Sequence, residues 1–109
     1  MLDIMDKYVE VRFLEREISA DLDAIKKIAN QIYNYALTQT GDQRKYFSHI
    51  AINFVEFAIG SVATVRQSID KNSLTTITTS PIFILDLVED FKRYAIYENL
   101  IANLRTAPF

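Results

Sequence analysis

Apolar residues recur every three or four positions along most of this chain, a spacing that places side chains on one face of an α-helix. The first such stripe consists of Ile4, Tyr8, Val11 and Leu14. The second consists of Leu22, Ile25, Ala29, Ile32 and Ala36, and the polar residues opposite it are Asp23, Lys27, Asn30 and Asn34. The third consists of Phe47, Ile50, Phe54, Ala58, Val62, Val65 and Ile69. Each stripe predicts an amphipathic helix with one buried face.

A fourth stripe follows Pro81, and this segment differs from the others because it has apolar residues on a second side. The main series is Phe83, Leu87, Phe91, Tyr94, Ile101 and Leu104. The second series is Ile82, Leu85, Ile96 and Leu100. A helix that is apolar on more than one side lies at the centre of a bundle or binds a partner. We expect one of these two situations for this helix.

Residues that favour helix ends separate the stripes. Ser19, which is followed by two aspartates, favours an N-cap. Gly41 suits a left-handed C-cap, and Asp42 suits the N-cap of the next helix. Ser80 and Pro81 combine a capping hydroxyl with a proline at the first helical position. Together these signals predict helices near residues 3–17, 20–38, 43–69 and 81–105.

Two further features interrupt the helical pattern. Gly60 lies inside the third stripe, where glycine costs about 1 kcal/mol relative to alanine, and a close helix crossing is the usual reason to retain it. Residues 72–80 are polar and β-branched without a helical period, and they predict the one real loop of the chain.

Composition sets the class of the protein. The chain has 109 residues, half of them apolar, which is enough for the core of one domain covering residues 1–109. The predicted fold is all-α, a single-domain bundle of about four helices. The absence of cysteine excludes disulfides and thiolate metal sites. We count no apolar run of the roughly 18–20 residues that span a membrane and no signal peptide, so we expect a soluble, cytoplasmic protein with no membrane partner.

The charge of the chain is unevenly distributed. The net charge of −2 argues against a strongly basic nucleic-acid binder. Residues 1–23 carry a net charge of −4, with seven acids against three basic residues, and the remainder carries +2, with nine basic and seven acidic residues. An acidic first helix on a mildly basic body is compatible with head-to-tail packing against a neighbour. It is equally compatible with a solvated acidic face.

Three basic doublets form the candidate contact surface, and each has a tyrosine nearby. They are Lys26 with Lys27, Arg44 with Lys45, and Lys92 with Arg93. The second doublet lies in a first helical turn, where exposed amides and cations together favour phosphate. Such a surface contacts a nucleic-acid backbone without reading sequence. Doublets of this kind are also common on solvated helices.

Catalytic chemistry has one candidate. Arg44 and His49 form an Arg-x4-His pattern that resembles the motif of HEPN ribonucleases, in which the arginine and histidine of two protomers meet and cleave RNA without metal. That family usually places a small polar residue after the arginine, where this chain has Lys45. We identify no metal site, because Glu89 and Asp90 are adjacent and not three or four residues apart.

A second resemblance covers residues 37–47, from Leu37 to Phe47. This segment resembles a Leu-Thr-x-x-Gln-x-Arg-Lys-like segment in some small subunits of CRISPR effector complexes, although here the glutamine is displaced and a glycine intervenes. Those subunits are helical bundles that hold nucleic acid and bridge larger subunits. The resemblance implies a cytoplasmic, non-catalytic assembly subunit without cofactors.

Three hypotheses therefore stand. The first is a non-enzymatic assembly subunit of a nucleoprotein complex, whose partners are larger subunits, copies of itself and single-stranded nucleic acid. The second is a metal-independent ribonuclease that uses Arg44 and His49. The third is a helical protein-interaction module without nucleic acid.

Overall fold

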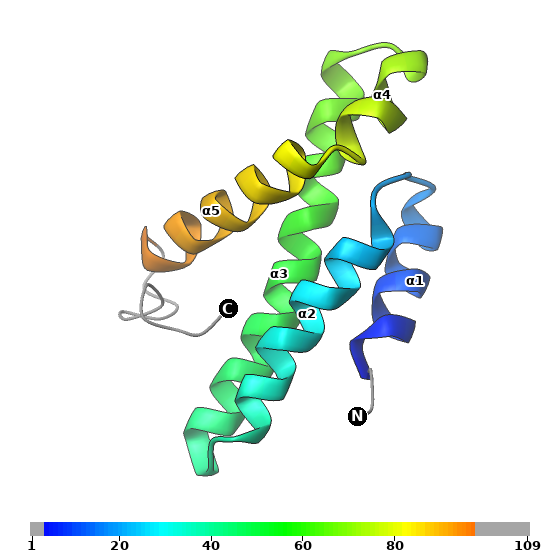
Figure 1. Cartoon of the computed structure of the whole chain (residues 1–109). Helices are drawn as coiled ribbons and strands as arrows, with labels where there is room; N and C mark the ends of the chain where they lie inside the picture. Colours follow the sequence, from blue (N-terminus) through cyan, green and yellow to red (C-terminus); the bar gives the residue numbers. More distant parts are fainter. Residues whose placement is uncertain (1–3, 98–109) are drawn as a thin grey trace.

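The computed structural model describes residues 4–97, and in this part of the chain five α-helices follow one another (Figure 1). They are α1 (Ile4–Arg16), α2 (Leu22–Leu37), α3 (Gly41–Ser68), α4 (Lys71–Thr78) and α5 (Pro81–Tyr97). The all-α prediction is therefore confirmed for these residues, with one helix more than the four expected. The ends predicted for the first and last helices fall partly outside the described residues.

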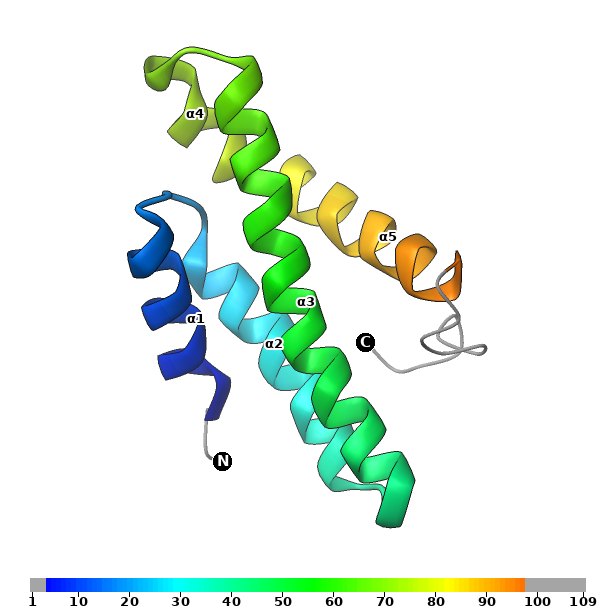
Figure 2. The same ribbon diagram turned by 180° about the vertical axis from the view of Figure 1, so that it is seen from behind.

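The 28-residue helix α3 is the axis of the molecule. Helix α2 lies along it, and α1 packs on α2 and α3. Figures 1 and 2 show α1 on one flank of α3 and α5 on the other, with α4 at the C-terminal end of α3. Helix α5 therefore lies at the edge of the described bundle, and the alternative of a central position does not hold for it.

The core lies between α2 and α3 and extends to both flanks. Its fully covered large side chains are Phe13, Phe54, Ile25, Ile32, Ile50, Val9, Val55 and Val62. The stripes predicted for α2 and for most of α3 are buried as expected, because both helices face other helices along their length. On α5, the predicted stripe residues Leu87 and Phe91 are buried, whereas Tyr94 is exposed.

The face predicted for the first helix is wrong. Helix α1 buries Met5, Val9 and Phe13, whereas Val11 and Leu14 are exposed, the latter at 77%. Both series have helical spacing, so α1 is apolar on two sides. The bundle takes the side that carries the larger phenylalanine, because burying it removes more apolar area from water.

The helix ends follow the sequence signals with some shifts. Ser80 accepts a hydrogen bond from the Phe83 amide at 3.1 Å, and Pro81 begins α5, as predicted. Helix α2 is capped by Asp21 and not by Ser19, because the Asp21 carboxylate accepts the Ala24 amide. Gly41 has the expected left-handed backbone, with φ of +58°, but it already belongs to the first turn of α3.

The predicted loop at 72–80 is also wrong, since most of it forms α4. Thr78 is fully buried and its hydroxyl lies 2.8 Å from the Leu74 carbonyl and 3.0 Å from the Ser19 carbonyl. Threonine is a poor helix former in isolation, but this tertiary contact to the α1–α2 connection stabilises the turn. Local composition carries no signal of such a contact.

Two expectations about α3 fail as well. Gly60 is exposed and nothing lies within 4 Å of where a Cβ would stand, so no close crossing accounts for it. By length and composition alone, α3 would be long and apolar enough to cross a membrane, contrary to the expectation that no segment is. In the bundle its apolar side chains pack against α2 and α5.

Candidate nucleic-acid interface

The doublet of Lys26 and Lys27 lies on α2, and its two members differ in what they contact. Lys26 Nζ donates a hydrogen bond of 2.6 Å to Glu10 Oε1 on α1. This hydrogen bond lowers the pKa of Glu10 and raises the pKa of Lys26. Lys27 is exposed and forms no ion pair with the part of the chain that the structure describes. Lys26 therefore joins two helices, and Lys27 is the member that can meet a ligand.

Lys27 borders a hollow of about 380 Å³ between α1 and α2, which we call the α1–α2 hollow. Its lining residues are Asp6, Asp23, Lys26, Lys27, Asn30, Gln31 and Asn34. The sequence places Asn30 on a polar outer face, but this residue is only 8% exposed. Its side chain accepts the Met5 amide at 3.0 Å and donates to Asp6 at 2.8 Å, so it fastens the first turn of α1.

The doublet of Arg44 and Lys45 is divided in the same way. The Arg44 guanidinium donates to the carbonyls of Gln39 and Leu37, at 3.0 and 2.9 Å. These carbonyls belong to the C-terminal end of α2 and the connection that follows, where a cation is favoured by the helix dipole. Arg44 thus closes the corner between α2 and α3. Lys45 is exposed beside it.

Lys45 borders a second hollow, of about 410 Å³, along the N-terminal half of α3. We call it the α3 hollow, and its lining residues are Asp42, Lys45, Tyr46, His49, Ile50 and Asn53. A smaller hollow of about 330 Å³ adjoins it through Asn53 and reaches Glu56, Phe57 and Tyr94 of α5. A cation, an amide and aromatic rings therefore succeed one another along one side of α3.

The third doublet lies on α5. Arg93 is exposed and makes a long ion pair of 3.5 Å with Asp90 of the same helix, and Lys92 is half-buried. The next residue, Tyr94, stacks against Phe57 with ring centroids 5.3 Å apart. The structure thus brings α5 and α3 together near the smaller hollow, whereas the doublet on α2 belongs to the separate α1–α2 hollow.

Within a single chain, the side chains of Arg44 and His49 do not converge on a common site. They are five positions apart on α3, which is about 140° around a helix. Arg44 is engaged with the end of α2, and His49 lines the α3 hollow. Among the described residues no group of three His, Cys, Asp or Glu side chains could hold a metal ion.

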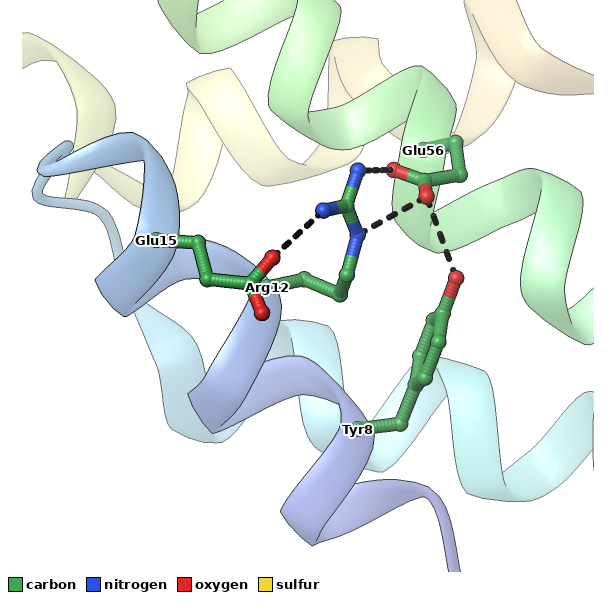
Figure 3. Close-up of polar contacts among 4 residues, drawn as sticks. All are labelled: Tyr8, Arg12, Glu15 and Glu56. Carbon is green, nitrogen blue, oxygen red and sulfur yellow. Dashed lines mark hydrogen bonds and ion pairs between the residues drawn. The ribbon is translucent and has the colours of Figure 1, made fainter.

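Sequence reasoning missed the strongest polar cluster of the molecule, which joins α1 to α3 (Figure 3). Arg12 forms two hydrogen bonds with Glu56, of 2.9 and 3.0 Å, and a third of 2.7 Å with Glu15. Tyr8 donates its hydroxyl to Glu56 at 3.1 Å. The spacing of Tyr8, Arg12 and Glu15 on one helix is a local signal, but Glu56 lies 44 positions beyond Arg12.

The pKa values in this cluster follow from the contacts. The hydrogen bond from Arg12 lowers the pKa of Glu56. Burial raises the pKa of Tyr8, and its hydrogen bond to Glu56 acts in the same direction. Glu56 is therefore ionised at neutral pH and neutralised by Arg12. The cluster is a structural bridge, and it does not involve Lys27 or Lys45.

Lys27 and Lys45 each lie beside amide side chains, Gln31 and Asn34 in the α1–α2 hollow and Asn53 in the α3 hollow. Amides and lysines of this kind can contact phosphate oxygens. Comparison of the chain with family models, with curated proteins and with solved structures finds no match in any of the three. The resemblance of residues 37–47 to CRISPR small subunits stays a prediction.

Proposed function

We propose that this chain is a non-catalytic, helical subunit of a nucleoprotein assembly, of the kind that the CRISPR resemblance implies. In this proposal it contacts the backbone of single-stranded nucleic acid without reading sequence, and it joins larger subunits and copies of itself. The observation that carries the proposal is the position of Lys27 and Lys45. Each is exposed at the rim of a hollow that also contains amide side chains.

The six basic residues of the doublets do not contribute equally to this proposal. Lys26 and Arg44 hold helices together, so their charges are already balanced by a carboxylate and by carbonyl dipoles. Lys27 and Lys45 keep their charge available to phosphate, and Lys92 and Arg93 add to it on α5. Substituting Lys26 or Arg44 would change folding and binding together, so neither residue is a clean probe.

The isolated chain should bind weakly, because its net charge is −2 and few cations are available. Each phosphate contact on a single strand contributes about 0.7 to the slope of log affinity against log salt. Two lysines therefore account for a slope change of about 1.4 if both contact phosphate. Aromatic rings beside the α3 hollow add stacking that does not depend on salt.

The test is retention of single-stranded RNA and DNA of mixed sequence at several salt concentrations. The variant is Lys27→Gln with Lys45→Gln. Its matched control is Gln67→Glu with Asn72→Asp, which changes the net charge equally at exposed positions outside both hollows. We expect the lysine variant to bind more weakly with a shallower salt slope, and the control to change little. If both double variants weaken retention equally, the binding depends on the net charge of the chain and not on Lys27 and Lys45, and the proposal is wrong.

A second candidate function is a protein-interaction module without nucleic acid. The observation that favours it is the exposure of large apolar side chains at the edges of the bundle, 77% for Leu14 and 72% for Ile82. Such residues indicate contact with protein when they are contiguous. This candidate takes precedence if neither RNA nor DNA is retained by the chain or by complexes that contain it.

A further inference from the structure

Helices α1 and α5 each leave an apolar stripe uncovered at an edge of the molecule. On α1 the exposed positions Leu14, Val11 and Lys7 follow one another in steps of three and four residues. On α5, read in the opposite direction, Ile82, Leu85 and Glu89 follow in the same steps. We call these the α1 stripe and the α5 stripe. Each spans about 80° or less of its helix, which is the width of a seam between two paired helices.

The two stripes match in chemistry as well as in spacing. When the helices are set antiparallel, Leu14 faces Ile82, Val11 faces Leu85, and Lys7 faces Glu89. Two apolar pairs are thus followed by one pair of opposite charge. Seven residues separate the ends of both stripes, about 10 Å along each axis, so all three pairs can form together. Ile4, one step further, meets the position of Lys92, whose stem is apolar.

The charges on α1 strengthen this match. Glu10 and Glu15, which flank the α1 stripe, are bonded to Lys26 and Arg12 of the same chain. Lys7 is therefore the charge that the stripe itself presents, although the helix as a whole is acidic. The α5 stripe presents Glu89, with the exposed Asp86 beside it.

We propose that the α1 stripe of one copy pairs with the α5 stripe of a second copy, so that copies of this chain associate head to tail. Figures 1 and 2 place α1 and α5 on opposite flanks of α3, so the stripes cannot meet within one copy. A contact between two different surfaces leaves one of each free at the ends, and the assembly grows as an open chain. This inference rests on the self-association in the proposed function and needs no nucleic acid.

The interface is small, because about two turns of each helix bury less than the roughly 1,200 Å² of a stable complex. The isolated protein should therefore associate reversibly, in the micromolar to millimolar range. Sedimentation velocity of the full chain without nucleic acid measures this directly. We expect the weight-average sedimentation coefficient to rise steadily with concentration. A chain that stays monomeric throughout that range overturns the proposal.

Two variants distinguish head-to-tail pairing from symmetric pairing. Leu14→Glu blocks the α1 stripe and Leu85→Glu blocks the α5 stripe, and both residues are exposed enough, at 77% and 62%, to leave the fold intact. Each variant alone should associate about tenfold or more weakly than the wild type. A mixture of the two should form a 1:1 dimer and stop there, since each partner contributes its one intact stripe. If one variant still dimerises alone, the pairing is symmetric and the proposal is wrong.

The charge pair tests the register. Lys7→Glu and Glu89→Lys should each weaken association by about three- to tenfold, because like charges then meet. The double variant should recover most of the loss. Gln43→Glu, an exposed substitution outside both stripes, is the control for added charge and should associate as the wild type does. If the double variant associates no more strongly than either single variant, this register is wrong.

Retention of RNA and DNA is measured separately, so failure of the stripe pairing and failure of the nucleic-acid contact remain distinguishable.

Discussion

The two flanks of α3 are held by different kinds of contact. On one flank α1 buries Phe13 and also makes directional bonds, from Arg12 and Tyr8 to Glu56. On the other flank α5 is held by aromatic packing, in which the Phe91 ring meets Phe54 edge to face and Phe57 at a tilt, with centroids 5.3 and 5.5 Å apart. Among the α5 side chains that the structure describes, from Pro81 to Ala95, none forms a hydrogen bond or ion pair with another helix.

The two flanks therefore differ in how strictly the position of the outer helix is defined. Hydrogen-bonded ion pairs fix the rotation and axial position of a helix, because their geometry is strict. Apolar contacts are non-directional and tolerate small shifts. The α1 flank therefore has a defined orientation, whereas α5 can adjust. We expect α5 to open locally at a lower free energy than α1.

The largest expected effect is that of Phe54→Ala, because Phe54 is fully buried on α3 and packs against Phe91 of α5. The free energy of unfolding should fall by about 3–5 kcal/mol, as for other buried phenylalanines. Urea unfolding measures it, and Leu14→Ala, at an exposed site, should change stability by less than about 0.5 kcal/mol. A loss at Phe54 of similar size to the control would show that this part of the core is not packed.

The next effect separates the flanks. Phe91→Ala removes the ring that anchors α5, and it should cost about 3 kcal/mol. Hydrogen exchange should then show lost protection in α5, whereas the amides of α1 and α2 keep theirs. If protection falls equally along the whole chain, the flanks unfold as one unit and the proposed difference between them is wrong.

On the polar flank, Glu56→Gln should cost about 1 kcal/mol at neutral pH, a value kept low because the side chain is 40% exposed. The pKa of Glu56 is lower in the folded chain than its ordinary value of 4.5, so its contribution is present above that pH and is lost as the pH falls through the folded value. Chemical unfolding of both proteins at neutral pH and at about pH 3 tests this. A difference that persists unchanged in acid would point to packing and not to charge.

The smallest expected effect is an increase in the free energy of unfolding. Gly60→Ala should stabilise the chain by about 0.5–1 kcal/mol, because Gly60 lies inside α3 and a Cβ there meets open space. The control is Gly41→Ala, which should destabilise, since Gly41 has φ of +58°. Thermal unfolding compares the two. A loss at Gly60 would mean that the surface beside it is covered, for example by another copy.

The sequence predicts four of the five described helices and the α2–α3 core, because one continuous apolar stripe on α2 and on α3 leaves no choice of face. It fails for α1, where the stripe through Val11 and the one through Phe13 both have helical spacing and only tertiary packing decides between them. It fails again at Thr78, whose buried hydroxyl reaches the Ser19 carbonyl 59 positions away.

The candidate site shows the same limit. Periodicity locates all six doublet residues on helices, but it cannot show which charges are already balanced. Lys26 and Arg44 are balanced by partners in other segments, the Glu10 carboxylate and the carbonyls of Leu37 and Gln39. Only three-dimensional contacts separate these two from Lys27 and Lys45.

The short connection between α2 and α3 has a consequence for the order of folding. Residues 38–40 join two helices that pack along each other, so closing this hairpin costs little chain entropy. Local contacts of this kind form early, and α5 can dock only after its binding face on α3 exists. Ile32→Val, within the hairpin, should therefore slow refolding, whereas Leu87→Ala on α5 should chiefly accelerate unfolding. The hydrogen bond from Arg44 to the Leu37 carbonyl then forms with the α2–α3 hairpin, before α5 docks and before the folded bundle can bind a partner.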